Sequence, residues 1–414
     1  MKKKTGNPEI RVAGYSDDWT TLKLASLCDK FTDGDWIEAK DQSEAGVRLI
    51  QTGNVGITHF VDKPDSRKWI SQETFERLNC EEVFPGDILI SRLPEPAGRA
   101  CIVPQMATKM ITAVDCTIAR TSSKVDSGFL VQYLSTRSYF EEVNTCLAGG
   151  TRQRISRSSL ADFDIPMPEE MHEQKIIGKY FSDIDRMIDT YSKEISRLIC
   201  VKKAMIEKMF PQGGADVPAV RFGQYKKPWR LCQFSEIFTE RHIIDTISDE
   251  YPQLAFTIEE GVIRPEDKKT NKRDFLIIDK ATKKYLQTEY DDIIYNPANV
   301  IYGAIHRNAL GKGCVSPIYK IFYTDQDSTF MECIVRHPRF IKEISRSMEG
   351  TVKKLRTLKP KAFLEMSAYI APTIEEQQQI GEYFRQMDRL IEIEKEELEK
   401  IKHIKSACLE KMFV

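Results

Sequence analysis

The chain has 414 residues, of which 30% are charged, and its formal net charge is −1. This length suits two or three domains with separate cores, and the near-neutral charge excludes a protein that is basic overall. Residues 10–168 contain more acidic than basic side chains, whereas residues 220–372 contain more basic ones. A site for a polyanion must therefore be a local basic patch, and the excess of basic residues favours the second half.

The ten cysteines are scattered, without a CxxC pair or a Cys/His cluster at metal-binding spacing. They read as reduced thiols of an intracellular protein and predict neither a disulfide framework nor a metal site. No run approaches the ~18 apolar residues of a membrane span, and the first four residues continue into a polar stretch, unlike a signal peptide. The sequence predicts a soluble, cytoplasmic protein with no membrane contact.

Short strands are the first predicted elements. Runs of β-branched and apolar residues, separated by Gly, Pro and Asp, occur at 47–51, 87–90, 100–103 and 116–120. Residues 129–146 have helical periodicity, as have residues 330–348 in the second half. Each half is therefore expected to contain a mixed domain, and the fold class is expected to be α+β.

One loop in each half places a cation after a predicted strand. We expect the strand at 87–90 to return through 98–102 and the strand at 292–294 to return through 311–315, which puts Arg99 and Lys312 in equivalent positions. Three further cations lie nearby, namely Arg92, His306 and Arg307. These loops are either ordinary solvated hairpin loops or loops that present cations to phosphates and base edges.

A second pair of loops carries a Gly-Thr dipeptide, at 150–151 and again at 350–351, followed by cations. Gly and Thr supply close-approaching amides and hydroxyls, and arginine supplies forked donors, which suits phosphate contact and guanine recognition. A loop that only links two helices is the alternative. The candidate DNA-binding residues here are Arg152, Gln153, which could read adenine, Arg154, Arg157, Lys353, Lys354 and Arg356.

The most conspicuous repeat is a long helix. Residues 173–210 and 376–413 align without a gap and share Glu-Gln, Gly, Tyr-Phe, Asp-Arg and Lys-Met-Phe at equal spacing. Apolar residues recur in steps of three and four, which predicts a helix packed along another helix. The predicted seam is Ile177, Phe181, Ile184, Ile188, Tyr191, Ile195 and Leu198 in the first copy, and Ile380, Phe384, Met387, Ile391, Leu398 and Ile401 in the second.

One copy alone could equally be a surface helix on a core, but two copies in one register favour an intramolecular pair. Lys202, Glu394 and Lys405 interrupt the seam without an evident reason. Thr373 and Glu376 have the spacing of a capping box at the start of the second helix, which lets the Thr oxygen and the Glu carboxylate satisfy free amides.

The duplication extends beyond the helices, because residues 8–19 and 218–229 match in Pro, Arg, Tyr and Trp. The short linker makes the second helix run antiparallel to the first, in a pseudo-twofold arrangement that holds a module at each end of a rod. The predicted layout is domain one at 1–168, helix one at 169–210, a linker at 211–219, domain two at 220–372 and helix two at 373–414.

Catalytic signals are thin. Residues 296–299 are similar to the Asn-Pro-Pro-aromatic loop of adenine methyltransferases, but they lack the second Pro and the aromatic residue. No phosphate-binding glycine loop, zinc motif or nucleophile elbow is present in the sequence. We therefore predict a chain without catalytic residues.

Taken together, these features resemble the specificity subunits of type I restriction-modification systems. The resemblance rests on the order and duplication of the Gly-Thr loops, the proline-acidic entry into each Glu-Gln helix, Gly86-Asp-Ile-Leu, and the run from Arg48 to Gly56, which residues 254–261 match only in part. It implies a DNA reader in which each module recognises half of a bipartite duplex target and the helices set the spacing.

The resemblance also implies that two methyltransferase subunits dock on the helices and that motor-nuclease restriction subunits join the complex. S-adenosylmethionine, ATP and magnesium would belong to those partners, and none would be bound by this chain. Two alternatives remain, a fused methyltransferase or nuclease with drifted motifs and a coiled-coil scaffold without a DNA role.

Overall fold

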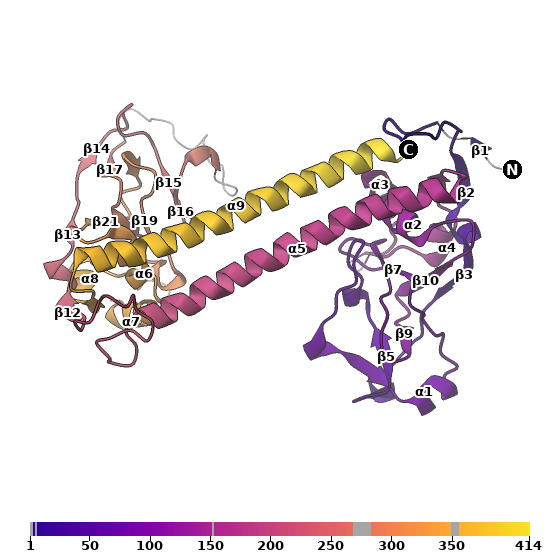
Figure 1. The fold of residues 1–414 in the computed structure, drawn as a ribbon, viewed down its shortest axis with the longest axis horizontal. Helices are drawn as coiled ribbons and strands as arrows, with labels where there is room; N and C mark the ends of the chain where they lie inside the picture. Colours follow the sequence, from indigo (N-terminus) through magenta and orange to yellow (C-terminus); the bar gives the residue numbers. More distant parts are fainter. Residues whose placement is uncertain (1–2, 5, 151–152, 268–282, 349–355) are drawn as a thin grey trace. The chain divides into compact units, whose positions relative to one another are not determined.

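The computed structural model describes residues 3–4, 6–150, 153–267, 283–348 and 356–414. The chain forms two compact units: unit 1 contains Met1–Lys193 and Lys395–Val414, and unit 2 contains Glu194–Glu394. Helices and sheets are mixed in both units, which confirms the predicted α+β class (Figure 1). Within the described ranges, no helix is both long and apolar enough to cross a membrane.

Unit 1 contains three small sheets. Their strand orders are β3(Cys28–Asp33)-β10(Cys116–Thr121)-β7(Ile88–Ser91)-β8(Ala100–Ile102), β4(Gln42–Ser43)-β6(Lys68–Ile70)-β5(Val47–Ile50)-β9(Met110–Thr112) and β1(Lys3–Lys4)-β2(Thr20–Lys23)-β11(Asp164–Met167). The short helices are α1 (Gln72–Arg77), α2 (Ser127–Tyr133), α3 (Arg137–Thr145) and α4 (Arg157–Ala161). The four runs predicted as strands from the sequence are confirmed as β5, β7, β8 and β10.

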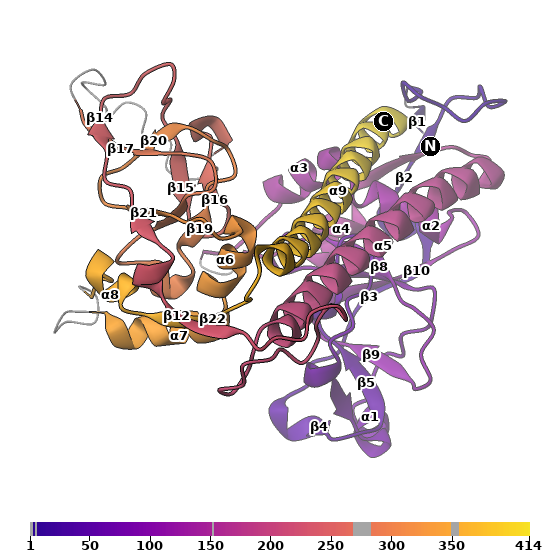
Figure 2. The same ribbon diagram turned by 60° about the vertical axis from the view of Figure 1, so that its left-hand side comes forward.

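Unit 2 repeats the first of these sheets in the same spatial order. Figure 2 shows the elements of unit 2 from a second side. Its sheets are β13(Thr239–Glu240)-β21(Lys320–Tyr323)-β18(Ile293–Tyr295)-β19(Ile305–Arg307), β14(Ile244–Asp245)-β17(Tyr285–Thr288)-β20(Gly313–Val315), β15(Ala255–Thr257)-β16(Gly261–Ile263) and β12(Arg230–Gln233)-β22(Ser367–Ile370). Its short helices are α6 (Ser328–Val335), α7 (Pro338–Ser347) and α8 (Pro360–Leu364).

The sheet order corrects one predicted equivalence. Strand β7 returns through β8, which contains Cys101, whereas β18 returns through β19, which contains His306. Strand β20, which follows Lys312, instead pairs with β17 in another sheet. Arg99 and Lys312 therefore do not occupy equivalent positions, because a local Gly-x-x-Cys likeness was mistaken for the return strand.

Each helix predicted at 129–146 and 330–348 is in fact two helices. A new N-cap starts the second helix of each pair: Thr136 Oγ1 accepts the N–H of Tyr139 at 3.3 Å, and His337 Nδ1 accepts the N–H of Arg339 at 3.2 Å. Capping side chains such as these satisfy amides that a continuous helix would have bonded internally. The apolar periodicity runs through both breaks, so it did not reveal them.

The two long helices are α5 (Met171–Met209) and α9 (Ile374–Met412). Within unit 1, the first half of α5 lies beside the last part of α9, and within unit 2 the opposite ends pair (Figure 1). The direction is antiparallel in each unit, as predicted. In unit 1, for example, Phe181 near the start of α5 packs on Phe413 beyond the end of α9, with ring centroids 5.7 Å apart.

Most of the predicted seam is buried. The side chains with less than a tenth of their surface exposed are Ile177, Phe181, Ile184, Ile195, Leu198, Ile380, Phe384, Ile391, Leu398 and Ile401. Ile188, Tyr191 and Met387 are half-buried.

Two of the interruptions in the seam now have a physical reason. Lys405 donates to Asp185 at 2.5 Å within unit 1, and Lys202 forms the equivalent ion pair with Asp388 within unit 2. Both carboxylates belong to the repeated Asp-Arg dipeptide. Each lysine therefore carries its charge to a partner on the facing helix, which is how a polar residue can occupy a packed seam.

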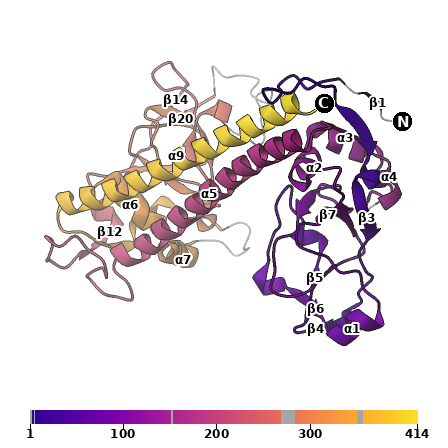
Figure 3. The same ribbon diagram turned by 45° about the vertical axis from the view of Figure 1, so that its right-hand side comes forward.

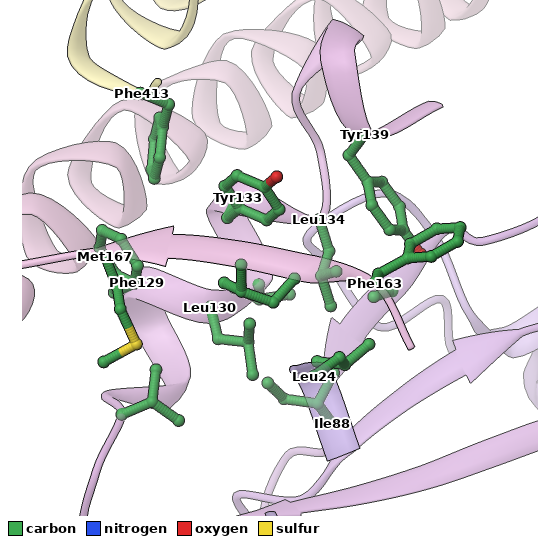
Figure 4. Packing of buried hydrophobic residues seen from close by; sticks show 14 of the residues in the cluster. Leu24, Ile88, Phe129, Leu130, Tyr133, Leu134, Tyr139, Phe163, Met167 and Phe413 are labelled. Atoms are coloured by element: carbon green, nitrogen blue, oxygen red, sulfur yellow. The ribbon is translucent and has the colours of Figure 1, made fainter. Parts of the chain in front are cut away.

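An aromatic cluster recurs in both units. In unit 1, Phe413 packs against Trp19, Phe129 and Phe181 with ring centroids 6.3, 5.3 and 5.7 Å apart. Figure 4 shows Phe413 and Phe129 among the buried residues of this core. In unit 2, Phe210 packs in the same way against Trp229, Phe330 and Phe384, at 5.7, 5.5 and 6.2 Å. Each core is thus assembled from a module, the start of one long helix and the end of the other.

The repeated Glu-Gln dipeptide anchors each long helix to its module. Glu173 and Glu376 are fully buried and accept paired hydrogen bonds from Arg11 (2.9 and 3.1 Å) and Arg221 (2.6 and 2.8 Å) respectively. These arginines are the ones that match between 8–19 and 218–229. The repeat in the sequence therefore marks a repeated buried ion pair.

The neighbouring glutamines bridge to the helix that each module contributes. Gln174 accepts the N–H of Asp126 at 2.8 Å, and Gln377 accepts that of Asp327 at 3.2 Å; both aspartates are N-caps. The helices approach so closely that a Cβ on Gly178 would lie 2.6 Å from the backbone nitrogen of Phe129. The matched glycines are thus required by contact with α2 and α6.

The predicted capping box at the start of α9 is present only in part. Thr373 Oγ1 accepts the N–H of Glu376 at 3.3 Å, as expected. The Glu376 carboxylate binds Arg221 and the indole N–H of Trp229 instead of contributing a reciprocal cap.

Candidate nucleic-acid interface

In unit 1 the two loops that were singled out from the sequence meet. The N–H of Ile155, which follows the Gly-Thr loop, donates to the carbonyl of Arg92, which follows β7, at 3.1 Å. Arg154 forms two backbone hydrogen bonds with Ala148 that close the Gly-Thr loop, at 2.9 and 3.0 Å. The buried side chain of Ile155 fixes this loop against the core.

Three arginines gather at this meeting point, around two aspartates. Arg92 Nε lies 3.4 Å from Asp33 Oδ1, Arg157 Nε lies 4.0 Å from Asp33 Oδ2, and Arg154 Nη1 lies 3.7 Å from Asp115 Oδ1. We call these five residues the arginine cluster. Three guanidinium groups face two carboxylates, so the cluster keeps a local positive charge on a chain that is neutral overall.

The members of the cluster differ in exposure. The side chains of Arg154 and Arg157 are 62% and 46% exposed, whereas that of Arg92 is 10% exposed and donates to the carbonyl of Val114 at 2.7 Å. Arg154 and Arg157 can therefore reach a bound polyanion, and Arg92 positions the loop beneath them. Asp33 and Asp115 carry no sequence signal, because they become neighbours only through the fold.

Arg99 has a structural environment. Its guanidinium donates to four backbone carbonyls, those of Thr52, Val55, Leu93 and Pro96, at 2.7–2.9 Å. Burial lowers the pKa of Arg99. These bonds tie the loop after β7 to the segment after β5, and DNA contact by Arg99 stays a prediction.

His306 and Arg307 of unit 2 are also largely enclosed. The His306 ring is bonded to the carbonyl of Ile258 at 2.8 Å, and burial lowers its pKa to about 4, so it is neutral at physiological pH. Arg307 is 11% exposed and pairs with Asp291 at 2.8 Å and Glu332 at 3.6 Å. Neither side chain presents a free charge to solvent.

Lys312 is 49% exposed and forms an ion pair with Glu250, over the ring of Tyr251. Gln153 and Arg356 are exposed. Arg152, Lys353 and Lys354 lie outside the described residues.

The segment before α8 in unit 2 repeats one contact of the loop in unit 1. The N–H of Leu358, a fully buried side chain before α8, donates to the carbonyl of Pro297 at 3.0 Å, which repeats the bond of Ile155 to Arg92. Pro297 therefore stands where unit 1 has Arg92.

No metal centre is assembled from the side chains of the described residues, since no group of three His, Cys, Asp or Glu is close enough. The described cysteines are free, and burial raises the pKa of the Cys101 and Cys116 thiols to about 12 and about 11, which keeps them protonated. The arginine cluster can bind an anionic ligand. The described cysteines, being protonated, offer no activated nucleophile.

Comparison with known proteins shows which family this chain resembles. The model of the type I restriction modification DNA specificity domain matches residues 16–199. The MjaVIII specificity subunit of Methanocaldococcus jannaschii, a type I restriction enzyme subunit, is 24% identical over 276 residues, which cover 62% of this chain and 62% of that protein. The MjaX specificity subunit of the same organism is 23% identical over 416 residues, covering 97% and 94% of the two chains.

Two solved structures share the fold. The S subunit of a type I restriction-modification system from M. genitalium superposes with a TM-score of 0.63 at 15% identity, covering 99% of each chain. A chain from a structural study of complex assembly in a type I restriction-modification system superposes with a TM-score of 0.52 at 14% identity, covering 95% of this chain and 97% of that one.

Proposed function

We propose that this chain, which resembles the specificity subunits of type I restriction-modification systems, recognises the DNA sequence on behalf of such a complex. Each module reads one half of a bipartite duplex target, and the paired helices hold the modules. The observation that carries the proposal is the repetition of one frame with two different loop sets. The ion pairs, the aromatic clusters and one four-stranded sheet of each unit match, while the loops around Arg92 and Pro297 differ.

The arginine cluster supports the first module as a DNA reader. Arg154 and Arg157 are exposed forked donors on a loop that is fixed by backbone bonds to the loop after β7. Forked donors on a rigid support suit phosphate oxygens and the O6/N7 edge of guanine. The two aspartates keep the guanidinium groups apart and oriented before DNA arrives.

The partners follow from the same proposal. Two methyltransferase subunits dock on the long helices, and motor-nuclease restriction subunits complete the assembly. This chain is non-catalytic, and S-adenosylmethionine, ATP and magnesium are bound by those partners. Purified chain that bound S-adenosylmethionine or cut DNA by itself would favour a fused enzyme instead.

An exchange of modules tests the division of labour. If residues 220–372 are replaced by the corresponding module of another specificity subunit, only one half of the methylated motif should change, because the other half is read by the first module. The motif is measured by mapping methylated adenines in DNA from cells that also carry the methyltransferase partner. A change in both halves, or in neither, contradicts the proposal.

Arg154→Ala tests the arginine cluster directly. We expect weaker DNA binding by the complex, with the slope of log K against log salt falling by about 1 if the contact is to phosphate. If Arg154 reads a base, one position of the motif should instead relax by about 1–3 kcal/mol. The matched control is Arg137→Ala, which removes an arginine that is 78% exposed and pairs with Glu141 on the same helix. Equal effects of the two substitutions would show that the loss is only one of net charge.

A further inference from the structure

Unit 1 contains a pocket beside the β4-β6-β5-β9 sheet that the proposed function does not use. Three strands of this sheet, β4, β5 and β6, are labelled in Figure 3. The volume of the pocket is about 330 Å³, at the small end of the range for sites that bind small molecules. The residues that define its chemistry are Arg48, Phe60, Asp62, Arg67, Trp69 and Met106.

Arg48 is a buried cation with donors to spare. It is 3% exposed, and its Nη1 donates to the carbonyls of Leu49 and Lys68 at 3.3 and 3.0 Å. Its Nη2 lies 3.9 Å from Asp62 Oδ1, which is too long for a hydrogen bond. Among the described residues, no hydrogen bond to Nε or Nη2 is found, although a guanidinium can donate five. Because Arg48 lines the pocket, these donors are available to a ligand that accepts from them.

The walls of the pocket suit a planar ring. Arg48 and Trp69 are directly opposite each other on β5 and β6, and the Arg48 Cζ lies 5.5 Å from the centroid of the Trp69 ring. Phe60 and Met106 are half-buried and complete an apolar lining. Aromatic and thioether side chains of this kind pack well on the face of a heterocycle.

Asp62 adds a hydrogen-bond acceptor to the pocket. Its carboxylate is 43% exposed, and the neighbouring Arg67 holds its pKa below the usual value, so it stays ionised. A carboxylate retains free lone pairs when it accepts from one arginine. The pocket therefore presents N–H donors of Arg48 and a carboxylate acceptor of Asp62 side by side, with Arg48 Nη2 3.9 Å from Asp62 Oδ1. One edge of a ligand can contact both groups.

We propose that this pocket binds a nucleobase that carries a carbonyl next to a ring N–H, as guanine and thymine do. The carbonyl oxygen accepts from Arg48, the ring N–H donates to Asp62, and the ring lies against Trp69 and Phe60. Adenine and neutral cytosine lack this adjacent pair. The base can come from a free nucleotide or from a nucleotide extruded from DNA, which is how proteins gain access to a whole base edge. Only the second source rests on the proposed function.

The first experiment needs no DNA. Binding of the monophosphates of guanosine, thymidine, adenosine and cytidine to the full chain is measured by saturation-transfer NMR and calorimetry. We expect the guanosine and thymidine monophosphates to bind about tenfold or more tightly than the other two, as bidentate base contacts usually discriminate. Equal affinity for all four nucleotides, or no binding of any, overturns the proposal.

Variants assign the site. Asp62→Ala changes a half-exposed side chain and should remove the preference for guanosine monophosphate, whereas Asp65→Ala, a nearby exposed acid that does not line the pocket, should keep it. Arg48→Gln should abolish binding, and hydrogen exchange of unit 1 reports whether that variant still folds. Retention of the preference in Asp62→Ala would place the nucleotide elsewhere.

A second experiment separates the two sources. Duplexes with one bulged guanine or one bulged adenine compete for the full chain in a fluorescence anisotropy assay. A preference for bulged guanine that Asp62→Ala abolishes identifies an extruded base as the ligand. Nucleotide binding without such a preference identifies a free nucleotide, and this result stands even if the DNA-reading role proves wrong.

Discussion

Replacing Phe413 with alanine is expected to lower the free energy of unfolding of unit 1 by about 3–5 kcal/mol and to leave unit 2 almost unchanged. Phe413 is 6% exposed and touches four aromatic rings of unit 1, those of Trp19, Phe129, Tyr133 and Phe181. These four aromatic residues all belong to residues 1–193 of unit 1. A substitution near the end of the sequence should therefore act on the first module.

Hydrogen exchange read peptide by peptide measures both units in one sample. In Phe413→Ala, the most protected amides of residues 10–168 should exchange about a hundredfold or more faster, while those of residues 220–372 keep their rates. Phe210→Ala is the matched control, because Phe210 has the same place in the aromatic cluster of unit 2. It should give the reverse pattern. Faster exchange in both modules, or in neither, would contradict the division of the chain into these two units.

The sequence was informative about the frame of the molecule, because the frame is repeated. Matching residues at matching spacing, such as Arg11 with Arg221, indicated the two modules and the two helices, and both the fold class and the family resemblance are confirmed. The pairing of each arginine with a glutamate of the long helix was not predictable. Its members lie 162 and 155 positions apart, and only the folded chain brings them together.

The loops were predicted less well, for the same physical reason. The loop sequences differ between the modules, so the repeat does not show which loop residues of the two modules correspond. The return strand of β18 was assigned to residues around Lys312 instead of to β19. Charge type also says little about exposure. Arg99 and Arg154 look alike in the sequence, yet one is bonded to four carbonyls and the other is 62% exposed.

The repeated ion pair leads to the second large expected effect. Arg221→Ala should destabilise unit 2 by about 3–5 kcal/mol, because it leaves the fully buried Glu376 carboxylate without its cation. Arg11→Ala should do the same to unit 1 through Glu173. Arg221→Lys is expected to recover only part of the loss, since an ammonium group cannot form the paired bonds of 2.6 and 2.8 Å.

A double substitution separates an uncompensated charge from lost packing. If the buried charge is the main cost, Arg221→Met combined with Glu376→Gln should be clearly more stable than Arg221→Met alone, because the amide needs no cation. It should not reach the wild type, since the paired hydrogen bonds from Arg221, of 2.6 and 2.8 Å, are lost. Hydrogen exchange of residues 220–372 provides the measurement, with residues 10–168 as the internal reference. A double variant that is no more stable than the single one would show that Arg221 stabilises unit 2 by the packing of its side chain. The two buried ion pairs would then hold the long helices by packing and not by charge.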